Sequence, residues 1–154
     1  MRTLIFLFIL FSAKSYAGDL PIQEVRRLYQ ASASKEEISI QLISILEKNN
    51  EHNNPTLAAY KACATMMMAK YVSNPFRKLS YFKGGKQLLE KCVSADTENA
   101  EIRYLRLTVQ SNAPSFLGYN QSITVDKQFL LHAVYNIKDV VLKQMINSFL
   151  KDAK

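Results

Sequence analysis

Apolar residues recur along most of the chain at spacings of three and four, which is the period of an amphipathic helix. Between residues 38 and 46, for example, Ile38, Leu42, Ile45 and Leu46 form one apolar stripe on a helical surface. The same period, broken by turn-forming residues, predicts about seven helices: 21–32, 34–48, 55–72, one after the turn at 73–75, one after the turn at 96–99, 124–137 and 139–150. We therefore expect an all-α fold in which antiparallel helix pairs stack as a short helical array.

The helix expected over 55–72 differs from the others because it is apolar nearly all round. Between Leu57 and Ala69 only Lys61 and Thr65 interrupt the apolar run. A helix that has no polar face is buried on every side. Its alanines allow neighbouring helices to approach closely, and its three successive methionines fill irregular gaps. We expect this helix at the centre of the domain.

The first 17 residues follow a different pattern. Arg2 precedes an apolar run over 4–11, and small residues, Ser15 and Ala17, lie three and one positions before Gly18. This pattern is typical of a cleavable secretory signal peptide. The alternative is a membrane anchor, but a bilayer-spanning helix needs about 20 apolar residues. We expect a signal peptide over 1–17, a single helical-repeat-like domain over 18–154 with no transmembrane segment, and a periplasmic or secreted protein.

The whole chain carries a formal net charge of +7, and loss of Arg2 and Lys14 with the signal peptide lowers this charge to +5. A mild basic excess serves solubility, and it also favours an acidic partner or an anionic membrane surface. We do not expect nucleic acid as a partner, because an exported protein seldom meets it.

The segment from Asn54 to Leu107 resembles a divergent tetratricopeptide unit. It contains an alanine-rich helix, a second helix with small residues at Gly85 and Cys92, and the sequence DTENAE before the next helix. It departs from that repeat in its longer loop around 71–81 and in Thr97, where the repeat has a proline. The resemblance implies a short tetratricopeptide-like array.

A second resemblance covers roughly residues 55 to 130. The residues that carry it are Asn74, Pro75, Lys78, Leu79, Phe82, Gly85, Lys86, Arg103, Tyr104, Leu105, Arg106, Phe116, Leu117, Gly118, Tyr119, Asp126 and Lys127. They are similar to positions in a family of small exported bacterial proteins of unknown function. This resemblance implies an envelope location and a helical-repeat fold, and it assigns no activity and no site residues.

A polar stripe is expected on the helix that follows the turn at 96–99. Arg103, Arg106 and Gln110 are spaced at i, i+3 and i+7, so they share one helix face. Guanidinium groups bind carboxylates and phosphates, and Lys83 and Lys86 would extend such a site. In a helical-repeat array the stripe would line the concave face, which usually holds peptides. The alternative is the ordinary solvated face of an amphipathic helix.

Aromatic residues gather in the two predicted loops that follow the third and fifth helices. These residues are Tyr71, Phe76, Tyr81, Phe82, Phe116 and Tyr119. Because both loops follow helices that run in the same direction, they belong at one end of the stack. Together with the methionines at 66–68 they would frame a pocket for an apolar ligand. The alternative is core packing beneath the loops.

The two cysteines, Cys63 and Cys92, fall on the third and fourth predicted helices. In an oxidising compartment, antiparallel packing of these helices permits a disulfide, worth about 3 kcal/mol. We favour the alternative, two buried thiols, because close helix packing selects small apolar residues.

No pattern in the chain indicates catalysis. His52 and His132 are distant in sequence, and the chain lacks CxxC, HExxH and Gly-rich phosphate-loop motifs. We therefore expect no metal, no cofactor and no enzymatic activity, and we interpret the domain as a module that binds another envelope protein or peptide. The candidate binding residues are Lys83, Lys86, Arg103, Arg106, Gln110, Tyr81 and Tyr119. The alternative function is a carrier of a small apolar or acidic ligand.

Overall fold

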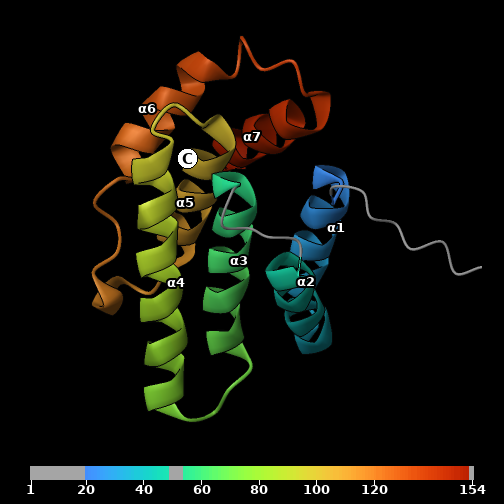
Figure 1. Ribbon diagram of the computed structural model, residues 1–154. Coiled ribbons are helices and arrows are strands. Elements are labelled where there is room, and N and C mark those ends of the chain that lie inside the picture. Colours follow the sequence, from blue (N-terminus) through green and yellow to red (C-terminus); the bar gives the residue numbers. More distant parts are fainter. Residues whose placement is uncertain (1–19, 49–53, 153–154) are drawn as a thin grey trace, which may run out of the picture.

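The computed structural model describes residues 20–48 and 54–152, and every regular element in this part of the chain is a helix (Figure 1). Its elements are α1 (Ile22–Ser32), α2 (Glu36–Lys48), α3 (Pro55–Met67), η2 (Met68–Lys70), α4 (Pro75–Ala95), α5 (Ala100–Asn112), η3 (Ser115–Leu117), α6 (Ile123–Ala133) and α7 (Val140–Asp152). Helix α1 pairs with α2, and α3 with α4, as antiparallel hairpins. The expected all-α array of antiparallel helix pairs is confirmed. The predicted signal peptide at 1–17 lies outside the described residues.

Three asparagines determine where helices begin. Oδ1 of Asn54, Asn74 and Asn99 accepts hydrogen bonds from the backbone N–H groups two and three positions later, at 2.9–3.2 Å. Pro55 and Pro75 follow two of these caps in the first helical position. Proline lacks a backbone N–H, and at this position the N–H would have no acceptor within the helix, so no hydrogen bond is lost. Local sequence therefore sets the starts of α3, α4 and α5.

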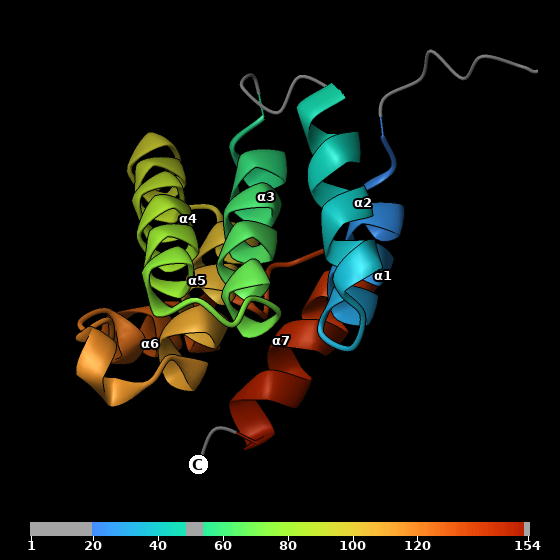
Figure 2. The same cartoon turned by 90° about the horizontal axis from the view of Figure 1, so that it is seen from below.

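The helices pack in a regular alternation. Each odd-numbered helix contacts the next odd-numbered helix, and each even-numbered helix packs against the two odd-numbered helices that flank it in the chain. Figures 1 and 2 show α3 at the centre, with α1 and α2 on one side and α4 and α5 on the other. Helix α7 crosses the end of the array at which α1, α3 and α5 begin.

Helix α3 is the buried centre that its apolar pattern predicts. Its buried residues are Leu57, Ala58, Ala59, Tyr60, Ala62, Cys63, Ala64 and Met66. They join residues of α1, α2, α4 and α5 in one apolar core. A second, smaller core joins α5, α6 and α7, in which Tyr104 and Phe149 meet edge to face with ring centroids 6.0 Å apart. The two cores account for the two halves of the array.

The third helix changes geometry earlier than its pattern predicts. The chain takes the tighter 3-10 form of η2 instead of continuing as an α-helix to residue 72. Tertiary hydrogen bonds accompany this change, because Nζ of Lys70 donates to the carbonyl of Ala33 at 2.7 Å and the hydroxyl of Tyr71 donates to the carbonyl of Ser32 at 2.6 Å. These bonds satisfy free carbonyl groups at the end of α1 and hold η2 against it.

Helices α3 and α4 approach each other closely at Gly85. A Cβ atom at Gly85 would lie 2.6 Å from the carbonyl oxygen of Ala62 and would overlap Cγ of Met66. The adjacent Gly84 has open space where a Cβ would stand. The close packing therefore requires glycine at one of these two neighbouring positions and not at the other.

We predict opposite effects of alanine at these two glycines. Gly85→Ala forces α3 and α4 apart and lowers the free energy of unfolding by about 1–3 kcal/mol, the usual cost of overpacking. Gly84→Ala, the matched control, raises it by about 0.5–1 kcal/mol, because alanine is the better helix former. Urea denaturation followed by circular dichroism at 222 nm measures both. Equal effects of the two substitutions would contradict the close approach at Gly85.

Candidate functional site

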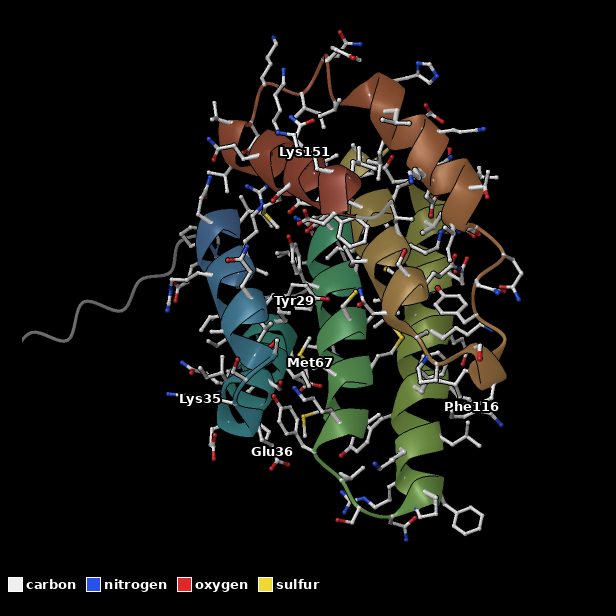
Figure 3. All side chains as sticks on the ribbon, turned by 180° about the vertical axis from the view of Figure 1, so that it is seen from behind. Tyr29, Lys35, Glu36, Met67, Phe116 and Lys151 are labelled. Carbon is white, nitrogen blue, oxygen red and sulfur yellow. The ribbon has the colours of Figure 1, made fainter. Side chains whose placement is uncertain are left out.

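A groove of about 920 Å³ runs along α3 at the end where α3 passes into η2. Its walls come from α1, α3, η2, α4, α5 and the segment 113–117. Figure 3 shows Tyr29 and Met67 between α1 and α3, and Phe116 in the segment that passes alongside α4. The groove thus lies on the face where three successive odd-numbered helices stand side by side.

The groove is apolar at its floor and open at its rim. Cys63, Met66 and Phe82 form the floor and are buried. On the rim, Leu79 is 40% exposed and Phe116 is 85% exposed. Exposed apolar side chains beside a recessed apolar floor are typical of a surface that binds another molecule.

Unequal helix lengths create the groove. Helix α4 has 21 residues, whereas α5, which packs against it, has 13. At 1.5 Å per residue the first half of α4 extends about 12 Å past the end of α5. Figure 1 shows α3 and α4 continuing together beyond α5. The groove-facing side of this hairpin end therefore has no α-helix over it within the described part of the chain, and the short segment 113–117 flanks it instead.

A small polar cluster lies in the wall of the groove. Tyr29, Cys63 and Thr108 all line the groove, and the ring of Tyr29 packs on Tyr60 with centroids 5.4 Å apart. Burial is the main cause that raises the pKa of Tyr29 well above its usual value, and the neighbouring Cys63 is the second cause. The phenol therefore stays protonated at neutral pH. The cluster thus brings polar groups to the wall but no charge, and the hydroxyl of Thr108 already donates to the carbonyl of Leu105 at 2.8 Å.

Arg106 is the centre of a buried ion network instead of part of an open surface. It is 8% exposed, and its guanidinium donates to both oxygens of Asp126 at 2.7 and 2.8 Å and to Glu90 at 2.9 Å. The hydroxyl of Tyr119 donates to the other oxygen of Glu90 at 2.5 Å. Arg103 also reaches Asp126, at 3.2 Å. The network fastens α6 and the segment before it to α4 and α5.

The expectation of a solvent-facing stripe on α5 therefore needs correction. Gln110 is 3% exposed and its side-chain oxygen accepts a hydrogen bond from the backbone of Ser122 at 3.0 Å, while the guanidinium of Arg103 lies 4.2 Å from the ring centroid of Phe129. Neither the open binding stripe nor the solvated face describes these residues. The physical reason is that α6 packs over this face of α5 and supplies the carboxylate of Asp126.

The other candidate residues lie apart from one another. Lys83 is exposed on α4, and Nζ of Lys86 stands 4.7 Å from the ring centroid of the buried Tyr119. Tyr81 lines a second hollow, of about 560 Å³, together with Tyr71 and Arg77. The structure thus divides the predicted site residues among a buried network, an exposed helix face and a separate hollow.

Of the predicted aromatic and methionine pocket, the structure brings Met66, Met67, Phe82 and Phe116 to the groove. Sequence reasoning missed the contributions of α1 and α5, namely Tyr29, Thr108, Val109 and Asn112. Each of these belongs to a helical stripe in its own helix, so no local signal marks it. Only the packing of α1, α3 and α5 side by side brings them together.

A second buried network joins all four odd-numbered helices. Arg26 of α1 is 3% exposed and donates to both oxygens of Glu101 at the start of α5, at 2.7 and 2.8 Å. The hydroxyl of Tyr60 in α3 donates to Glu101 at 2.6 Å, and Arg26 also reaches Asp139 just before α7, at 2.9 Å. Hydrogen bonding to Glu101 raises the pKa of Arg26 further above its usual range. Asp139 in turn accepts from the backbone N–H of Leu142 at 3.0 Å and so caps α7.

Both cysteines are buried free thiols. Burial raises the pKa of Cys63 to about 12 and that of Cys92 to about 11. A protonated, buried thiol is a poor nucleophile. Within residues 20–48 and 54–152 no group of three His, Cys, Asp or Glu side chains is placed to hold a metal ion, and no helix there is long and apolar enough to cross a membrane.

We predict that Arg26→Met lowers the free energy of unfolding by about 3–5 kcal/mol, because it leaves the carboxylate of Glu101 buried without its partner. Arg27→Met is the matched control: Arg27 pairs with Glu24 on the exposed surface, and its loss changes stability little. Adding Glu101→Gln to Arg26→Met recovers part of the loss. Chemical denaturation measures all variants, and similar stabilities of the Arg26 and Arg27 variants would contradict the network.

We also predict slow thiol chemistry in the folded protein. A rise in the pKa of Cys63 from 9.0 to about 12 lowers its thiolate fraction at pH 8 by about a thousandfold. Ellman's reagent therefore detects both thiols promptly in guanidinium chloride and neither of them promptly in native buffer. Fast native labelling, or an unfolded protein without free thiols, would contradict this assignment.

Comparison with known proteins adds no relative. No protein-family model, no curated protein and no solved structure matches the chain. The groove and its surroundings are therefore the basis for any functional proposal.

Proposed function

We propose that this protein is a non-enzymatic binding module of the cell envelope and that its groove holds a segment of another protein or a peptide. The groove itself is the observation that carries the proposal, because a recessed apolar floor lies along the face of three adjacent helices. In helical-repeat arrays the corresponding face takes extended or helical peptides. The resemblance of the segment 54–107 to a tetratricopeptide unit supports the same interpretation.

The open rim favours a polypeptide segment over a small ligand. A carrier encloses most of the surface of its ligand, typically 70–90%. Here Leu79 and Phe116 at the rim remain 40% and 85% exposed, so the groove is open along its length to a longer molecule. Met66 and Met67 at the floor and wall adapt their shape to different apolar side chains.

A carrier of a small apolar or acidic ligand is the second candidate. Two observations favour it. The volume of about 920 Å³ falls within the usual range of ligand pockets, and the hydroxyl groups of Tyr29 and Thr108 give an otherwise apolar wall a polar contact. The sequence pattern of 1–17 supports export for either candidate.

We predict that Leu79→Glu abolishes partner binding, because it places a charge at the apolar rim. The matched control is Leu131→Glu on α6, where the side chain is 47% exposed and lies outside the groove. Protein isolated from the envelope fraction, with Gly18 as its expected N-terminus, is cross-linked to its neighbours in both variants and in the wild type. Native mass spectrometry of the same samples reports any small molecule.

The expected result is a cross-linked polypeptide that the wild type and the Leu131 variant retain and the Leu79 variant loses. A stoichiometric small molecule that is lost with Leu79→Glu, without a polypeptide partner, would reverse the order of the two candidates. A partner retained equally by both variants would remove the groove from the binding surface.

A further inference from the structure

The groove has cations at its rim and no acid in its walls. Among the described residues that line it, Lys70 and Lys78 are charged and none is Asp or Glu. Lys70 is engaged, since its Nζ donates to the carbonyl of Ala33 at 2.7 Å and lies 5.8 Å from the ring centroid of Tyr71. Lys78 is exposed, and no carboxylate of the described residues pairs with it. The electrostatic potential at the rim is therefore positive.

Helix α4, which supplies Lys78, is basic overall. It carries five basic residues and one acidic residue, Glu90. Glu90 is occupied by Arg106 and by the hydroxyl of Tyr119, so it does not offset the lysines of its own helix. The acidic pair at the start of α2, Glu36 and Glu37, lies near Tyr71. Burial is the main cause that raises the pKa of Tyr71, and the two carboxylates raise it further. Glu36 lines the second hollow. Of the five cations of α4, Lys78 alone lines the groove, while Arg77 lines the second hollow and Lys86 lies over the ring of Tyr119.

Apolar side chains stand among these cations. Phe76 is 82% exposed on the first turn of α4, Leu79 lies one turn further on, and Phe116 approaches from the segment beside α4. A partner that covers the groove would remove Leu79 and Phe116, which line it, from water, at about 25 cal/mol for each Å² of apolar surface. Apolar contacts and negative charges in the same partner would therefore both stabilise its binding at the rim.

We infer that the groove takes an amphipathic peptide segment whose apolar face carries aromatic or long aliphatic side chains and whose flanking residues are Asp or Glu. This inference rests on the proposed function and specifies its partner. The apolar side chains enter the floor formed by Cys63, Met66 and Phe82, and the carboxylates lie against Lys78 at the rim.

A peptide fits this surface better than a lipid bilayer does. The floor residues are buried at the bottom of a recess between helices, and a planar membrane surface would contact only the rim. An amphipathic helix or extended segment enters such a recess with its side chains. Lys78 and Leu79 both line the groove, so one partner contacts both.

The test is selection of a phage-displayed random library of peptides of about twelve residues on the purified exported protein. We expect enriched peptides to combine aromatic or aliphatic residues with a net negative charge. Synthetic versions lose affinity by about tenfold with Lys78→Glu, and Leu79→Ser weakens them similarly. Lys151→Glu on α7, an exposed site away from the groove, and Leu131→Ser are the matched controls.

Raising ionic strength from about 0.1 to about 1 M weakens binding, because the Debye length falls from about 10 to about 3 Å.

The outcomes separate the two claims. Peptides that depend on Leu79 but are neutral or basic, and that are indifferent to Lys78→Glu, would overturn the acidic partner and leave the proposed function standing. Failure to enrich any Leu79-dependent peptide would overturn both. Sedimentation with phosphatidylglycerol and phosphatidylcholine vesicles is the parallel arm. Tight binding to the anionic vesicles that is lost with Phe76→Ser would overturn the peptide as the inferred partner and identify a membrane surface in its place.

Discussion

The buried ion pair between Arg26 and Glu101 sets how the odd-numbered helices stand relative to one another. A buried charge without its partner is costly, so the populated packing is the one that brings α1 to the start of α5. Tyr60 and Asp139 complete the network from α3 and from the start of α7. Hydrogen-bond geometry of this kind is directional, whereas apolar packing tolerates sliding. The side-by-side arrangement that forms the groove follows from this constraint.

The groove then results from the different lengths of two helices, α4 and α5. Helix α5, with 13 residues, covers only part of the α3–α4 hairpin, whose second helix has 21. The uncovered end keeps an apolar wall, because α3 is apolar nearly all round, and a positive charge at its rim, because Lys78 is exposed there without an acidic partner among the described residues. Gly85 holds the hairpin closed along this end. Helices form most of the wall, so an occupant meets a surface whose shape is already set.

The fold was largely predictable from sequence because its determinants are local. Helical period, asparagine caps and the all-round apolar run of α3 each act within a few residues. The site was less predictable because its determinants are distant. The spacing of Arg103, Arg106 and Gln110 correctly places them on one face, but that face is covered by Asp126 and its helix, more than ten positions away. Likewise nothing near Tyr29 indicates that it faces α5.

The bond from Arg26 to Asp139 joins residues 113 positions apart. In a simple repeat array each unit contacts only its neighbours, and terminal units can fray independently of the rest. Here Arg26 of α1 is hydrogen-bonded to Glu101 at the start of α5 and to Asp139 just before α7. Both of these helices lie beyond α3, the odd-numbered neighbour of α1. Neither end of this array is free to melt alone, and the stack therefore behaves as one cooperative unit instead of a row of separable modules.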